Sequence, residues 1–282
     1  MNNQIKEIVS DTLPIIRQVN YAYKYRHLIQ KLWVNLQVKL SLGKPKILML
    51  GQAGVGKSVL CSTIHGEANT LDWQKPDTSR DVEIKPIQLG AWTQIVSVIP
   101  GQDSSERLNA LDKAINSNGI DGIIYVVDWG YTSIREPHIR NAMIEISGID
   151  SIKKLREKNL ETELDDFSQL LHLLKMSIPN NRGPKWIMIA INKLDLFKNE
   201  EHEAIHYYKL DSNSDFQKKI SEFISKVGSQ NIKFDFQLVN ARSEKFVWGK
   251  EEITPLINEI DEHQAILKKF IDNLAFLVDK AE

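Results

Sequence analysis

The stretch GQAGVGKS, residues 51–58, decides the fold that we expect for this chain. It matches the pattern G-x-x-x-x-G-K-S without a gap, and it stands between the apolar run KILMLG (46–51) and a helical segment. In this context the motif is typical of a loop that cradles phosphate groups with backbone N–H groups and the positive end of the following helix. The alternative, a glycine-rich turn that binds nothing, agrees less well with a full match between a strand and a helix.

Each position of this loop has an expected role in holding a nucleoside triphosphate. Gly51 permits the sharp turn out of the strand, while Gly54 and Gly56 let the backbone approach the phosphates without a Cβ in the way. Lys57 can reach the β- and γ-phosphates, and the hydroxyl of Ser58 can ligate Mg²⁺. The nucleotide-binding residues expected from this segment are Gly51, Gln52, Ala53, Gly54, Val55, Gly56, Lys57, Ser58 and Val59.

Short apolar runs alternate with helical segments along the chain, which predicts an α/β fold. We expect a six-stranded, mostly parallel sheet, with one antiparallel edge strand and with helices at both ends of the chain. The antiparallel strand belongs to a hairpin that turns near Gly90 and Ala91. The expected strands are 46–51, 82–90, 92–101, 122–128, 185–192 and 234–240, and the expected helices are about 57–65, 104–117, 137–147, 161–177, 214–228 and 251–280.

The sequence divides into an N-terminal helical extension at 1–44, a main domain at 45–248 with a helical excursion at about 131–180, and a C-terminal helix at 249–282. Residues 1–46 are rich in lysine and arginine, with aromatic side chains interleaved. A basic amphipathic helix can lie on an anionic membrane or dock on a partner. We favour packing on the main domain or against the C-terminal helix, whose excess of acidic residues complements this charge.

Bulk composition limits the classes of function. The net charge of −1 over 282 residues gives no support for binding to nucleic acid, so we expect no such partner. The single cysteine, Cys61, excludes an internal disulfide and fits a reducing compartment. No apolar run approaches the roughly 20 residues of a membrane helix, and the N-terminus lacks the pattern of a secretory signal. We therefore expect a cytoplasmic protein.

The run INKLD, residues 191–195, indicates which base is bound, because it directly follows an expected strand at the edge where ligands bind such sheets. The carboxylate of Asp195 can accept two hydrogen bonds, from the N1–H and the exocyclic amine of guanine. Adenine would leave this buried acceptor unpaired, which costs about 1–3 kcal/mol. The stem of Lys193 can lie along the base and ribose, and Asn192 would brace this loop against the phosphate loop. Without the phosphate loop, such a short motif would be read as an ordinary polar loop.

The order of these motifs over about 46–245 resembles that of the Ras-like and translation-factor-like GTPases. The resemblance implies a Rossmann-like P-loop NTPase fold, a GTP/GDP cycle with Mg²⁺, and regulation through protein partners. In VNARSEK (239–245), Asn240-Ala241-Arg242 falls where this class carries Ser-Ala-Lys. The resemblance therefore implies that Ala241 and Arg242 border the guanine, with the Ala241 N–H contacting the guanine oxygen.

The first switch segment of this class corresponds to QKPDTSRDVE, residues 74–83. The resemblance implies a threonine that binds Mg²⁺ through its hydroxyl and the γ-phosphate through its N–H, and Thr78 is our first assignment. Ser79 is the alternative, because the spelling T-S-R-D leaves the register open. Arg80 could offset phosphate charge during transfer, although a solvated loop arginine is an equally good explanation.

The second switch segment corresponds to VSVIPGQDSSE, residues 96–106, which departs from the pattern Asp-x-x-Gly of the class. Val98 occupies the position of the aspartate that holds a magnesium-bound water, and valine cannot replace that contact. The Gly101 N–H can still meet the γ-phosphate, and Gln102 can still orient the attacking water. This segment is similar to that of the bacterial gliding-motility (MglA-like) GTPases, which hydrolyse GTP slowly alone and faster with a partner protein.

Three hypotheses about function follow. The first is a GTP-binding switch with slow hydrolysis, in which Gln102, Lys57 and Thr78 are catalytic and Ser58 and Thr78 hold Mg²⁺. It signals through its switch loops and helical additions to a protein effector or activating protein. The second is a catalytically weak or inactive GTP-binding sensor or scaffold. The third is an assembly GTPase that self-associates through its flanking helices, at a membrane or free of it.

Overall fold

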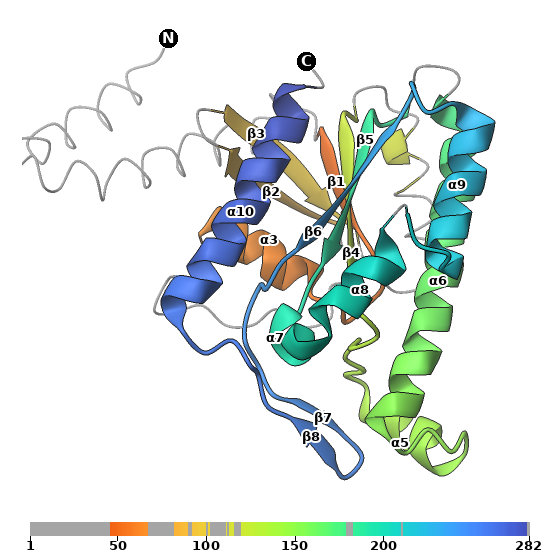
Figure 1. The fold of residues 1–282 in the computed structure, drawn as a ribbon, viewed down its shortest axis with the longest axis vertical. Coiled ribbons are helices and arrows are strands. Elements are labelled where there is room, and N and C mark those ends of the chain that lie inside the picture. Colours follow the sequence, from red (N-terminus) through yellow and green to blue (C-terminus); the bar gives the residue numbers. More distant parts are fainter. Residues whose placement is uncertain are drawn as a thin grey trace, which may run out of the picture. The chain divides into compact units, whose positions relative to one another are not determined.

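The computed structural model of this protein describes residues 46–66, 82–89, 92–99, 101, 111, 113–115, 120–178, 183–209 and 211–280 (Figure 1). Several expectations lie outside the described residues: the N-terminal extension, the first switch segment with Thr78 and Ser79, Gln102, and most of the helix expected at 104–117. The division of the chain into domains therefore stays a prediction.

The described strands include a six-stranded sheet in the order β2-β3-β1-β4-β5-β6. Its strands are β1 (Ile47–Leu50), β2 (Glu83–Leu89), β3 (Trp92–Val98), β4 (Gly122–Val127), β5 (Trp186–Ile191) and β6 (Lys233–Leu238). Within this sheet, the described part of β2 at one edge pairs antiparallel with its neighbour, and the other described pairs of the same sheet are parallel. The expected α/β P-loop fold is confirmed.

Helices cover both faces of this sheet (Figure 1). They are α3 (Lys57–His65), α5 (Pro137–Glu145), α6 (Ile152–Ser177), α7 (Leu194–Phe197), the short 3₁₀ helix η4 (Lys198–Glu200), α8 (Glu201–Tyr208), α9 (Asp215–Val227) and α10 (Ile260–Asp279). One apolar cluster joins alternate strand residues to α6, α8 and α9, and the other joins the remaining strand residues to α3 and α10. Strands β1, β4 and β5 are buried on both faces, which is why their sequences are almost continuously apolar.

The expected helix at 251–280 is wrong in its first part. Helix α10 begins at Ile260, and the preceding residues form a hairpin of β7 (Phe246–Trp248) and β8 (Glu251–Ile253). The indole of Trp248 is buried, and its Nε1 donates to the carbonyl oxygen of Ile149 at 2.8 Å. Gly249, with a φ of 58°, makes the turn. This hairpin depends on a contact with a distant loop, which local helical periodicity does not reveal.

Two further helical segments differ from the expectation. Helix α6 begins at Ile152 instead of about 161, because the Ser151 hydroxyl accepts a hydrogen bond from the Lys154 N–H and caps the helix. The segment from α7 to α8 was not expected to be helical. Its side chains Leu194, Phe197 and Tyr208 are buried in the apolar cluster that includes strand residues. Packing against the rest of the fold therefore stabilises these short helices.

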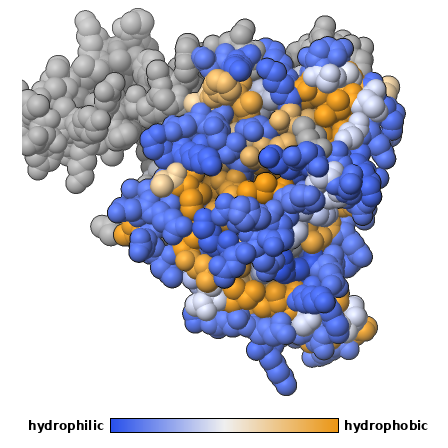
Figure 2. All heavy atoms as spheres, in the orientation of Figure 1, coloured by the Kyte–Doolittle hydropathy of each residue, from blue (hydrophilic) through white to orange (hydrophobic). Residues whose placement is uncertain are grey.

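Hydrophilic residues cover much of the face seen in Figure 2, with hydrophobic atoms in separate areas between them. Exposed apolar side chains come from different elements and include Ile146, Met176, Val247, Ile260 and Phe276. Scattered exposure of this kind is ordinary on a folded chain. Among the described residues, no helix has the length and hydropathy that crossing a bilayer requires.

An aromatic cluster joins α6, α9 and the sheet. The rings of Phe167 and Phe216 stack with centroids 4.3 Å apart, and Tyr125 of β4 lies 4.8 Å from Phe167. The hydroxyl of Tyr125 donates to Asp166 at 2.7 Å. Because Phe167 is fully buried, this cluster fixes the long helix on the sheet.

We predict that Phe167→Ala lowers the free energy of unfolding by about 3–5 kcal/mol, because it removes a large buried ring and leaves a cavity. Urea unfolding followed by circular dichroism measures the change. Phe276→Ala, at an exposed position of α10, is the control and should shift stability by about 0.5 kcal/mol or less. Equal effects of the two substitutions would contradict this placement of α6.

Candidate nucleotide-binding site

The phosphate loop has the backbone shape that its glycines predict. Gly54 has a φ of 88° and Gly56 has a φ of 95°, and residues with a Cβ rarely adopt such values. A Cβ on Gly54 would lie 2.1 Å from the carbonyl oxygen of Ser133, and one on Gly56 would lie 2.6 Å from Nδ2 of Asn192. The loop therefore packs so closely against two other loops that both positions require glycine.

Lys57 and Ser58 begin helix α3 directly after the loop. The Lys57 Nζ donates to the carbonyl oxygens of Gly51 at 2.9 Å and Gln52 at 2.7 Å, so the buried ammonium closes over its own loop. The Ser58 hydroxyl donates to Oε1 of Glu83 at 2.9 Å. Both side chains thus lie beside the loop that the sequence predicts to hold phosphates.

Gly101 of the expected second switch lies against the phosphate loop. Its carbonyl oxygen accepts a hydrogen bond from the Ala53 N–H at 3.1 Å. A Cβ on Gly101 would lie 2.4 Å from Nζ of Lys57. Val98 is buried in the apolar cluster beneath α3, where its side chain offers no group that binds a cation.

Asn192 joins the phosphate loop to the loop that follows β6. Its Nδ2 donates to the carbonyl oxygen of Val55 at 2.9 Å, and its Oδ1 accepts from the Ala241 N–H at 3.0 Å. The brace expected from the sequence is therefore present. The Ala241 N–H, which the resemblance assigns to the guanine oxygen, donates to Asn192 here, and its contact with guanine stays a prediction.

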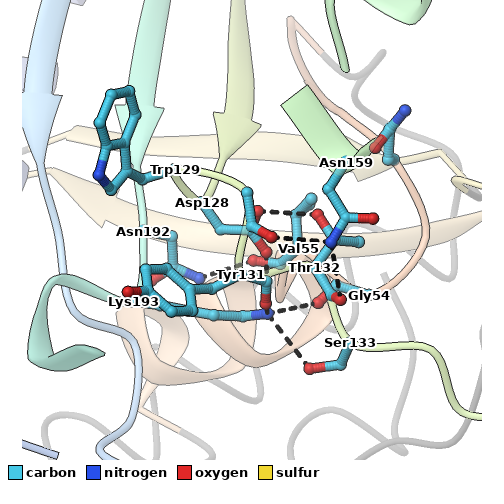
Figure 3. A network of polar contacts seen from close by, with 12 residues as sticks. Gly54, Val55, Asp128, Trp129, Tyr131, Thr132, Ser133, Asn159, Asn192 and Lys193 are labelled. Atoms are coloured by element: carbon cyan, nitrogen blue, oxygen red, sulfur yellow. Dashed lines mark hydrogen bonds and ion pairs between the residues drawn. The ribbon is translucent and has the colours of Figure 1, made fainter. Parts of the chain in front are cut away.

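Lys193 occupies the centre of a polar network between three loops (Figure 3). Its backbone is left-handed, with a φ of 62°. Its Nζ donates to the carbonyl oxygens of Gly54 at 2.8 Å and Tyr131 at 2.5 Å, and it lies 2.8 Å from Oδ2 of the buried Asp128. The charged end of Lys193 thus holds the phosphate loop against the loop after β4, while its stem remains the expected support for the base.

The loop after β4 contributes residues that sequence reasoning missed. The hydroxyl of Thr132 donates to Oδ1 of Asp128 at 2.8 Å, and Nδ2 of Asn159 in α6 donates to the carbonyl oxygen of Gly130 at 2.7 Å (Figure 3). The sequence contains one indication that this loop belongs to the site, because Asp128 directly follows an apolar strand, as Asn192 does. The contribution of Asn159 had no such signal, since it comes from the middle of a helix.

Asp195 carries a buried oxygen without a donor. Oδ2 accepts from the Glu244 N–H at 3.1 Å, whereas Oδ1 has no hydrogen-bond partner in the described part of the chain. Burial raises the pKa of Asp195 to about 6, against the opposing effect of the Glu244 N–H. A buried acceptor left unpaired is costly, so this carboxylate fits a ligand that brings N–H donors.

The residues expected around the base line one pocket together with part of the phosphate loop. The pocket, with the open space at its mouth included, has an empty volume of about 520 Å³. Its lining includes Gly54, Gly56, Val59, Asn192, Lys193, Asp195, Ala241 and Arg242, with Ser133, Arg135, Leu196, Glu244, Lys245 and Phe246 completing it. The structure therefore brings the two predicted halves of a nucleotide site together.

The residues at the start of α3 also fit a magnesium ion. In the ranges that the structure describes, no group of three or more His, Cys, Asp or Glu side chains could hold a metal. Magnesium bound with a nucleotide takes most of its oxygens from phosphate and water. The hydroxyl oxygen of Ser58 is a ligand of the required kind, and the carboxylate of Glu83 lies beside it as its hydrogen-bond acceptor.

Comparison with solved structures finds 925 similar chains, among them the following two. "The Structure of the Mammalian SRP Receptor" is 15% identical with a TM-score of 0.45, covering 82% of this chain and 98% of that chain. A dimerization-deficient mutant of Toc33 from Arabidopsis thaliana is 11% identical with a TM-score of 0.41, covering 91% of this chain and 92% of that chain.

No curated protein sequence matches this chain significantly. A family model does match: the Gtr1/RagA G protein conserved region aligns with residues 46–276. The aligned region contains the phosphate loop, the Asn192–Asp195 loop, and helix α10 almost to its end. Because this match spans most of the chain, the protein belongs to the Gtr1/RagA family of GTP-binding G proteins.

Proposed function

We propose that the protein is a GTP-selective switch that hydrolyses GTP slowly and signals to a protein partner through its switch loops and helical additions. The observation that carries the proposal is that Oδ1 of Asp195 has no hydrogen-bond partner among the described residues and lies in a pocket shared with the phosphate loop. Guanine presents two adjacent N–H donors to such a carboxylate, and adenine does not. The buried charge therefore favours one base and disfavours the other.

The proposed chemistry is transfer of the γ-phosphoryl group to water. Lys57 would leave the carbonyl oxygens of its own loop to neutralise the β- and γ-phosphates, and Ser58 and Thr78 would hold the bound Mg²⁺, which supplies positive charge. Gln102 would orient the water. The apolar Val98 and the resemblance to MglA-like proteins support a slow intrinsic rate that a partner accelerates.

Two alternatives lead to different observations. A sensor or scaffold would bind GTP without turnover, and its helical additions would act through a partner. An assembly GTPase would change its mass between GDP and a non-hydrolysable GTP analogue, which light scattering detects. We favour a switch that acts in the cytoplasm on a protein effector, without nucleic acid, and we place membrane attachment second to it.

The Asp195 contact predicts base selectivity. We expect Asp195→Asn to weaken GDP binding about 5- to 150-fold, because the amide replaces one acceptor with a donor and loses about 1–3 kcal/mol. Calorimetric titration with GDP and ADP measures both affinities. Asp272→Asn on the exposed side of α10 is the matched control and should bind as the native protein does. The proposal fails if ATP displaces GTP from the native protein as well as GTP itself does.

The pKa of Asp195 predicts that binding depends on pH. Only the ionised carboxylate accepts both guanine N–H groups, and its pKa is about 6 in the unliganded protein. GDP affinity should therefore be constant above about pH 7 and fall by up to tenfold per pH unit below about pH 6. Because GDP phosphates also titrate near pH 6, the relevant quantity is the difference from Asp195→Asn, which retains only the phosphate effect.

The same pKa shift has the opposite consequence for the stability of the unliganded protein. Since the folded-state pKa lies above the ordinary value of 3.8, ionisation is disfavoured in the folded state. The free energy of unfolding should decline as the pH rises from about 4 to about 6 and then level. Identical pH profiles for the native protein and Asp195→Asn would contradict the buried carboxylate.

Turnover separates the switch from the sensor. With GTP and Mg²⁺, we expect slow phosphate release by the native protein and at least about a tenfold decrease in Gln102→Ala, because the attacking water loses its orientation. Nucleotide affinity should be retained in this variant, since the base and phosphate loops are unchanged. No release above background, even with partner proteins added, would exclude the enzyme and favour the sensor.

A further inference from the structure

Glu83 and Val98 face each other at the edge of the sheet. They are direct partners in the antiparallel ladder between β2 and β3, and the side chains of such partners extend from the same face. Val98 belongs to the apolar cluster beneath α3. Glu83 therefore extends toward the same helix as an acidic side chain at position 98 would.

The hydrogen bond between Ser58 and Glu83 has the direction that a metal site requires. The Ser58 hydroxyl donates its proton to Oε1 of Glu83 at 2.9 Å. A hydroxyl that binds a cation uses an oxygen lone pair for the cation, so its proton must be directed to an acceptor elsewhere. Glu83 already provides that acceptor.

Lys85 orients the other oxygen of the same carboxylate. The Lys85 Nζ lies 3.5 Å from Oε2 of Glu83 and donates to the hydroxyl of Ser62 at 2.8 Å. Ser62 belongs to α3, as Ser58 does. Two hydrogen bonds, one from Ser58 to Glu83 and one from Lys85 to Ser62, therefore link β2 to this helix. Contacts that orient a carboxylate in this way are typical of the groups that support metal ligands.

We propose that Glu83 supplies the carboxylate that position 98 lacks. It is a positioning residue, which accepts the proton of Ser58 and places negative charge beside Mg²⁺. This inference rests on the proposed binding of a guanine nucleotide with Mg²⁺. The site thus has a carboxylate at the open end of the β2–β3 hairpin, but this carboxylate belongs to β2 instead of β3. The affinity of the site for Mg²⁺ is retained in this way.

The test is the Mg²⁺ dependence of GDP release from the full chain, followed with a fluorescent GDP analogue as free Mg²⁺ is varied. The native protein should release the nucleotide more slowly as Mg²⁺ rises. Glu83→Gln should weaken the apparent Mg²⁺ affinity about tenfold, the range found when groups that support metal ligands are lost. Adding Val98→Asp to Glu83→Gln should recover most of this loss. Glu161→Gln, on an exposed part of α6, is the matched control.

The native background gives an independent measurement that needs no change at Glu83. If Glu83 already supplies the carboxylate, Val98→Asp alone should improve Mg²⁺ affinity by less than about threefold. An improvement of about tenfold or more would show that the native site lacks such a carboxylate. Unchanged Mg²⁺ affinity in Glu83→Gln, tighter binding in that variant, or Mg²⁺-independent GDP release by the native protein would each overturn this inference alone. Failure of the native protein to bind GDP at all would overturn the proposed function.

Discussion

The buried amide of Asn192 is the contact on which the arrangement of the site depends. One side of the amide donates to the phosphate loop at Val55, and the other accepts from the loop after β6 at Ala241. A buried amide that lost either partner would pay for an unpaired polar group, so the two loops hold each other in place. The order of the sheet makes this possible, because β4 alone separates β1 from β5 and their loops emerge at the same edge.

Around this brace, the two ends of the site differ in how completely their polar groups are satisfied. The network of Lys193 and Asp128 is internally paired and connects the loops after β1, β4 and β5. Such a network is rigid when its members are satisfied. Asp195 is different, because one buried oxygen has no donor among the described residues and its pKa is raised as a result of burial. A buried carboxylate with an unsatisfied oxygen destabilises the unliganded site. Its place in a preformed pocket indicates that the site is organised for a ligand with complementary N–H donors.

The phosphate end of the site shows how a strand pairing can carry a chemical group. In an antiparallel ladder each residue has one direct partner on the neighbouring strand, and both side chains extend from the same face. The register that pairs Glu83 with Val98 therefore brings a carboxylate to the helix that carries Ser58. A motif read along one strand contains the apolar residue and omits its partner, although the two occupy neighbouring positions in space.

The sequence by itself determined the fold class, the six strands, and the loops that carry the expected phosphate-binding and base-binding residues of the pocket. These follow from local signals: apolar runs mark strands buried on both faces, and the glycine pattern and the N-K-x-D run mark loops at their ends. Only the tertiary structure decided the β7–β8 hairpin, the start of α10, and the partners Asn159 and Glu83. Each of these depends on contacts between residues far apart in the chain, such as Trp248 with Ile149 or Ser58 with Glu83. Local periodicity cannot specify such contacts, because they arise only when packed elements bring the two side chains together.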